Sequence, residues 1–160
     1  MYVDDVTEFM TWLEYPDAPP KTVSNFNFNP MRLKDLQTRN NATYKGFMAL
    51  ILKNSARDLI SGTRMNLETP ITSKTNKIIG SKAPNDYLSE IINRYQVSRP
   101  NLERYLASHW IDINLLMDEE FNEFIAARAG LLLDAVEKVT GKKILGRDSD
   151  EVKNFFGRAI

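Results

Sequence analysis

The chain holds few of the side chains that usually carry acid–base or metal chemistry. Cysteine is absent, and histidine occurs once, at His109. A disulfide, a thiolate zinc site, a cysteine nucleophile and a metal site built from several histidines of this chain are therefore excluded. Because His109 lies beside Trp110 in an apolar stretch, we interpret it as a hydrogen-bonded packing residue rather than a catalyst. Ser55 and Ser61 have no nearby base, so a serine nucleophile is not supported.

Two other patterns are explained without a ligand. The seven glycines are scattered along the chain and form no phosphate-binding loop. The acidic run at residues 118–120 could bind a cation, but acidic residues in the first turn of a helix are explained by the helix dipole. We therefore interpret Asp118 as the cap of a long helix.

A local concentration of positive charge is the more informative feature. The whole chain is neutral, with 21 basic and 21 acidic residues. Residues 21–65 nevertheless hold an excess of basic side chains, and such a surface can bind phosphate even in a neutral protein. The alternative is that these side chains are the solvated faces of different helices. The candidate nucleic-acid-binding residues are Arg39, Lys45, Arg57, Arg64, Lys74 and Lys77.

Apolar spacing predicts a single, compact, mainly α-helical domain over residues 1–160. Residues 1–40 are expected to form a helix over 3–13 and then a Pro- and Asn-rich crossing segment, in which Phe26 and Phe28 lie against the core. Residues 41–65 are expected to form a helix over 41–60 that closes at Gly62. Residues 66–82 lack helical periodicity and are rich in β-branched side chains, which predicts one short irregular or β segment near residues 66–80.

The C-terminal helices are expected within residues 83–160, and most of them carry start or stop signals. The signals are Pro84 for the first, Ser98 with Pro100 for the second, Asp118 and Gly141 for the two ends of the long helix, and Asp148 with Glu151 for the last.

The sequence favours a soluble, cytoplasmic protein without a membrane partner. The first residues include Asp4, Asp5 and Glu8, where a secretory signal would carry positive charge. The longest apolar runs are only a few residues, such as residues 49–52, whereas a membrane span needs about 20.

A series of stretches in fixed order carries a family resemblance. They are residues 32–39 (RLKDLQTR), 44–50 (YKGFMAL), 56–58 followed by Gly62, 69–80 (TPITSKTNKIIG), 83–84 with 86–88, 108–112 (SHWID), 121–128 and 139–142 (VTGK). In this order they resemble the C-terminal half of GmrSD-type restriction endonucleases, which are modification-dependent phage-defence enzymes with a His-Asn-His nuclease domain. The stretches touch nearly the whole chain.

The resemblance implies a DNA endonuclease. In that family a histidine of a His-His-Ile-Phe-Pro-like motif is the general base on water, and a divalent metal such as Mg²⁺ stabilises the phosphate leaving group. Asn76 matches the later asparagine of the motif, and Asn66 is a candidate for the middle one. Here, however, Met65 is followed directly by Asn66 with no histidine nearby, and His109 belongs to a different matching stretch.

We therefore expect a catalytically incomplete chain. Either the histidine segment has been lost at residues 65–66, or the sequence joins two pieces of a longer protein there. The resemblance implies a helical scaffold and DNA-contacting part of a metal-dependent endonuclease, although this chain alone supports no metal site. It also implies two partners: modified or foreign DNA, and an N-terminal nucleotide-binding domain or subunit. The alternative is a non-catalytic protein–protein interaction or inter-domain docking domain that uses residues 25–28 as its surface.

Overall fold

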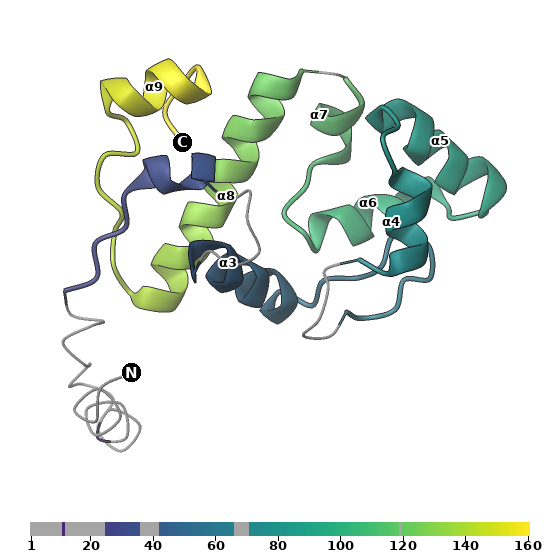
Figure 1. Cartoon of the computed structure of the whole chain (residues 1–160), viewed down its shortest axis with the longest axis horizontal. Coiled ribbons are helices and arrows are strands. Elements are labelled where there is room, and N and C mark those ends of the chain that lie inside the picture. Colours follow the sequence, from purple (N-terminus) through teal and green to yellow (C-terminus); the bar gives the residue numbers. More distant parts are fainter. Residues whose placement is uncertain (1–10, 12–24, 36–41, 66–70, 119) are drawn as a thin grey trace.

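The computed structural model describes Thr11 and residues 25–35, 42–65, 71–118 and 120–160. This part of the chain is compact and helical and contains no strand, which confirms the predicted mainly α-helical class (Figure 1). None of its helices combines the length and apolar character that crossing a bilayer requires. The elements are η1 (Pro30–Asp35), α3 (Ala42–Lys53), α4 (Ser73–Ile79), α5 (Pro84–Arg94), α6 (Arg99–Ala107), α7 (Ile113–Met117), α8 (Phe121–Thr140) and α9 (Asp150–Phe156).

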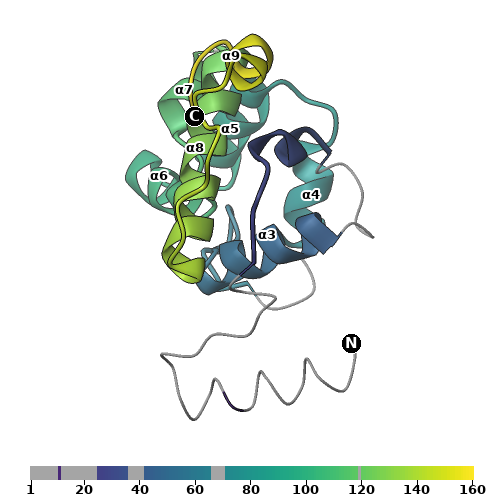
Figure 2. The same cartoon turned by 90° about the vertical axis from the view of Figure 1, so that its left-hand side faces the viewer.

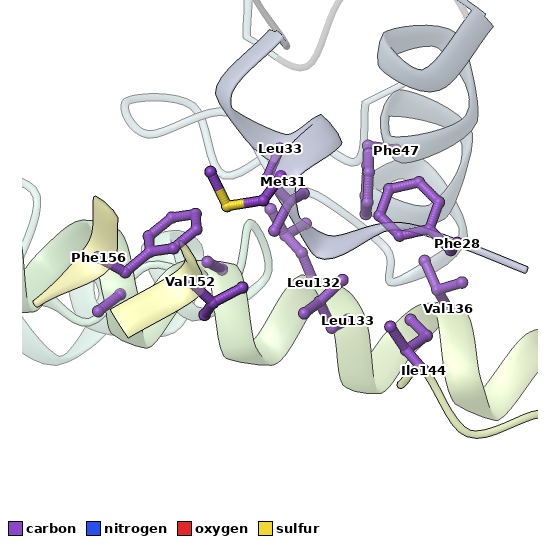
Figure 3. Packing of buried hydrophobic residues seen from close by; sticks show 12 residues of the cluster. Phe28, Met31, Leu33, Phe47, Leu132, Leu133, Val136, Ile144, Val152 and Phe156 are labelled. Carbon is purple, nitrogen blue, oxygen red and sulfur yellow. The ribbon is translucent and has the colours of Figure 1, made fainter. Parts of the chain in front are cut away.

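One hydrophobic core surrounds α8, which buries a stripe of apolar side chains at helical spacing that includes Ala129, Leu133 and Val136. Residues from η1, α3 and α9 cover this stripe (Figure 3). Phe28 and Phe47 meet edge to face beside Val136, with their ring centroids 5.8 Å apart. This arrangement confirms that Phe28 lies against the core. The docking alternative expected residues 25–28 to form an exposed aromatic surface. Phe28 is buried, so its ring is not part of such a surface.

The chain after α8 runs back along that helix to α9 (Figure 2). Gly141 ends α8 with a left-handed backbone (φ 68°), as its position predicted. Arg147 then fastens the returning segment to α8: its guanidinium pairs with Asp134 at 2.7 Å and donates to the backbone oxygen of Gly130.

A second core lies between α5, α6 and α7. The helices predicted to start at Pro84 and at Ser98 with Pro100 are both present, and each begins with a proline in its first turn. Helix α7 packs against both α5 and α8, so it connects the second core to the first. The side chains that fill this core are Leu59, Leu88, Ile91, Val97, Leu102, Leu106 and Ile113.

Two predicted helix caps are wrong. Asp118 does not begin the long helix; it ends α7, and α8 starts after Glu120. The reason is that Asp112 caps α7, a short helix that the sequence analysis missed, by accepting from the backbone N–H of Asn114 at 2.8 Å. The cap of the last helix is Ser149 rather than Asp148, because the Ser149 hydroxyl accepts from the backbone N–H of Val152 in the first turn of α9.

The two elements on either side of residues 66–70 also differ from prediction. Helix α3 ends at Lys53 rather than near residue 60, because Ser55 adopts a left-handed backbone (φ 64°) and turns the chain. Gly62 therefore does not close a helix. The prediction of an irregular or β segment near residues 66–80 is wrong for Ser73–Ile79, because these residues form α4. Residues 66–70 and the predicted helix over 3–13, Thr11 apart, lie outside the described part.

Candidate nucleic-acid interface

Residues 56–65 form a tight turn that brings Arg57 and Arg64 opposite each other. These two residues make an antiparallel bridge. The turn is closed by backbone hydrogen bonds from Asp58 N–H to the oxygen of Thr63 (2.9 Å) and from Met65 N–H to the oxygen of Ala56 (2.8 Å). The result is a two-armed loop with a cationic residue on each arm.

The carboxylate of Asp58 organises this turn from within. Asp58 is only 1% exposed. Its Oδ1 accepts from the backbone N–H groups of Ile60 and Ser61 and from the Ser61 hydroxyl, at 3.2, 2.9 and 3.0 Å. A buried carboxylate needs such donors, because an ion taken out of water without them is strongly destabilised.

The same carboxylate joins the turn to α4. Its Oδ2 accepts from the Thr72 N–H at 3.1 Å and from the Thr75 hydroxyl at 2.7 Å. The Thr72 hydroxyl in turn accepts from the Thr75 N–H at 3.1 Å, which caps α4. One side chain therefore connects the segments that precede and follow residues 66–70.

This hydrogen bonding keeps Asp58 ionised. Burial raises the pKa of the carboxyl group, but the donors from Ser61, Thr75 and Thr72 outweigh burial and hold the pKa well below its usual range. The negative charge of Asp58 is thus directed inward. The turn and α4 have no other acidic residue among residues 56–65 and 71–80.

Four of the predicted nucleic-acid-binding residues are on this unit, and all four are exposed. They are Arg57 and Arg64 on the turn and Lys74 and Lys77 on α4. We call residues 56–65 with α4 the basic unit. Asn76, the predicted catalytic-motif residue, is also exposed on α4.

Two of the four cationic side chains, Arg57 and Lys74, make a contact that fixes where their charge lies. Arg57 Nη1 donates to the backbone oxygen of Gly62 at 2.8 Å, which holds the guanidinium against its own turn. Lys74 Nζ lies 5.5 Å from the ring centroid of Tyr95, a cation–π contact. None of the four cations has an ion-pair partner among the described residues. Their charge is therefore not neutralised by an acid in the described part of the chain.

Lys45, the other predicted cation that the structure describes, is not part of this unit. Lys45 is exposed on α3, whose buried face belongs to the core around α8. Arg39 and Asn66 lie outside the described residues.

His109 has the packing role that its surroundings predicted. It is 5% exposed, and its Nε2–H donates to the backbone oxygen of Arg57 at 2.7 Å. Burial, together with the positive charge of Arg128, lowers the pKa of His109 in spite of the Arg57 hydrogen bond and the negative charge of Asp58. A neutral imidazole committed to a backbone oxygen positions the turn and does not act as a base on water.

The basic unit does not fit the divalent metal that the resemblance implies. No group of three or more His, Asp or Glu side chains in the described part of the chain could hold a metal ion. Asp58, the one carboxylate of the unit, is already occupied by five donors. The chemistry of these residues is that of hydrogen-bond donors to an anion.

Sequence reasoning missed Asp58, the residue that assembles the unit. The local signal was present, since an aspartate that accepts from the N–H groups two and three residues later is typical of a turn. Its bond to Thr75, 17 residues along the chain, had no signal in the spacing.

Comparison of the chain with protein-family models, with curated proteins and with solved structures finds no match.

Proposed function

We propose that this chain is a cytoplasmic helical domain that binds the phosphate backbone of DNA. The observation that carries the proposal is the basic unit: four exposed cations on two segments held together by a buried, inward-facing carboxylate. Cations without acidic partners attract phosphates and release counterions when they bind. Backbone contacts of this kind position a protein on DNA without reading its sequence.

The resemblance extends this proposal to a scaffold and DNA-contacting part of a metal-dependent endonuclease of the restriction or phage-defence type. On this reading the domain is catalytically incomplete, because His109 is buried and hydrogen-bonded to Arg57. The general base and the Mg²⁺-like metal would come from a segment or subunit other than the residues described. An N-terminal nucleotide-binding partner, and modified or foreign DNA as the target, belong to the same extension.

Salt-dependent binding tests the core of the proposal. A fluorescently labelled DNA duplex is titrated with the protein at low and at moderate salt, and anisotropy gives the affinity. We expect binding at low salt that weakens steeply as salt rises. Removal of two charges from α4 (K74Q/K77Q) is expected to weaken binding, whereas the matched removal of two exposed charges near the C-terminus (K143Q/K153Q) is expected to leave it unchanged. Absence of binding at low salt would reject the proposal.

A docking domain is the second candidate, and one apolar hollow favours it. A surface pocket of about 370 Å³ lies between the crossing segment, α3 and α8, and Phe26, Phe47, Leu50 and Val136 contribute to its walls. Such a hollow could receive an apolar side chain of a partner domain. Gly46 lies in its wall with open space around it. If docking is the function, Gly46→Leu fills the hollow and abolishes partner binding while DNA affinity stays as in the wild type.

A further inference from the structure

A second surface pocket, of about 440 Å³, lies between the C-terminal ends of α3 and α8. Its walls combine apolar and cationic side chains. Trp110, Leu50 and Val139 provide the apolar part, and Lys53 and Lys138 provide the charge. None of the described residues that line it is acidic. A hollow of this size that combines an aromatic wall with polar and cationic groups suits a small ring-bearing anionic ligand.

Trp110 lies in the wall of this pocket on a backbone turn that hydrogen bonds support. Its backbone is left-handed (φ 55°), a conformation that is rare for a bulky residue. Backbone hydrogen bonds on both sides support it, from Trp110 N–H to the oxygen of Ala107 at 3.0 Å and from Ile111 N–H to the oxygen of Leu106 at 3.1 Å. The indole also packs against the core around α8. A strained backbone that its surroundings maintain is typical of functional positions.

Hydrogen bonds to Ser108 link the pocket wall to the basic unit. The Asn54 amide, in the pocket wall, donates to the backbone oxygen of Ser108 at 3.0 Å. The hydroxyl of the same serine accepts from the Arg57 N–H at 3.0 Å. Ser108 therefore joins the backbone of Arg57 to Asn54 in the pocket wall, which places the pocket beside the turn that carries Arg57.

We infer that this pocket takes one unpaired nucleotide of a DNA strand, with its base packed against Trp110 and its phosphate near Lys53 and Lys138. The inference rests on the proposed DNA-binding function and adds a preference for a single-stranded or flipped-out nucleotide. Base–aromatic stacking beside a cationic groove is how proteins commonly bind single strands. Because the lining residues that the structure describes include no acid, the two lysine charges are available to a phosphate.

Tryptophan fluorescence tests this inference directly. The chain has two tryptophans, so a W12F variant reports on Trp110 alone. The probes are a 12-nucleotide deoxyadenosine strand, an abasic strand of the same length and charge, and free dAMP. We expect the adenine strand to quench Trp110 fluorescence and the abasic strand to leave it unchanged. W110A is expected to weaken binding of the adenine strand about tenfold, and K53Q/K138Q to weaken it more than the K143Q/K153Q control.

The outcomes separate this inference from the proposed function. If the adenine strand binds with salt dependence but leaves Trp110 fluorescence unchanged, the pocket inference is overturned and DNA binding by the basic unit stands. Quenching by free dAMP without quenching by the strand also overturns it, since the pocket then serves a mononucleotide. If K53Q/K138Q lowers the melting temperature and leaves strand affinity intact, the lysines only complement the helix ends, and the inference fails.

Discussion

The hydroxyl of Thr75 donates to Oδ2 of Asp58 at 2.7 Å, and both residues are buried. This bond joins a residue of the 56–65 turn to the first turn of α4. Because Arg57 flanks Asp58 and Lys74 flanks Thr75, the same bond sets the spacing between cations that are distant in sequence. The relationship explains how cations that are distant in sequence come to share one unit in a neutral chain.

Replacement of Thr75 by valine should destabilise the fold. Valine keeps the shape of threonine but removes the donor to Asp58 and the acceptor for the Thr72 hydroxyl. Loss of a hydrogen bond to a charged group costs about 2 kcal/mol. Thr75→Ser, which keeps the hydroxyl and loses one methyl group, should cost about 1 kcal/mol. Urea unfolding at 25 °C measures both losses, and a loss for Thr75→Val no larger than that for Thr75→Ser would show that the hydroxyl contributes no more than the methyl group.

The stability of the protein should fall below about pH 4, in part because of Asp58. Its folded-state pKa is depressed by the hydrogen bonds from Ser61, Thr75 and Thr72, which outweigh burial. A carboxyl group whose pKa is lower in the folded state stabilises the fold above its unfolded-state pKa, and that contribution is lost as the pH falls toward the folded value. The stability gap between the wild type and D58N should therefore narrow from pH 6 to pH 3. A constant gap would contradict the assignment.

Substitution of Gly62 should be costlier than substitution of Gly141, although both have a left-handed backbone (φ 65° and 68°). A Cβ atom at Gly62 would lie 2.3 Å from Oη of Tyr105, whereas one at Gly141 meets no atom within 4 Å. Gly141→Ala should cost about 1 kcal/mol from backbone strain alone. Gly62→Ala should cost about 3 kcal/mol, because a clash adds to that strain. Chemical denaturation compares the two variants, and equal costs would contradict the close approach of Tyr105.

His109 should titrate below the ordinary histidine pKa of about 6.5. Burial disfavours the imidazolium, and the positive charge of Arg128 acts in the same direction. Because it is the only histidine, its NMR signals are unambiguous, and their chemical shifts against pH give the value. Since the folded state disfavours the protonated form, stability should fall as the pH drops through about 6.5. A measured pKa of 6.5 or higher would contradict the burial of the imidazole, since the hydrogen bond to the Arg57 oxygen by itself raises the pKa.

The sequence predicts the helices whose signals are local. Helix α5 has Pro84 at its start and buried Leu88 and Ile91 at helical spacing, and α8 ends at Gly141. These features lie within one or two turns of each other, so periodicity and capping rules suffice.

The errors arise where distant contacts decide the structure. Thr72 and Thr75 are β-branched residues, which favour a strand. In the structure the Thr72 hydroxyl caps α4 and the Thr75 hydroxyl donates to Asp58, and these two hydrogen bonds stabilise a helix. Leu59 continues the apolar pattern of α3, yet it belongs to the second core because the chain turns at Ser55. The predicted cations Arg57, Arg64, Lys74 and Lys77 therefore share one unit because of the contact between Asp58 and Thr75, which their spacing in the sequence does not predict.

The salt slope of DNA affinity tests the central claim most directly. Each cation that contacts a phosphate contributes about one unit to the slope of log affinity against log salt. We predict that the variant R57Q/R64Q/K74Q/K77Q binds a DNA duplex more weakly than the wild type and with a slope shallower by several units. The K143Q/K153Q control should retain the wild-type slope. If the variant with four substitutions keeps the wild-type affinity and salt slope, the basic unit does not contact the DNA backbone.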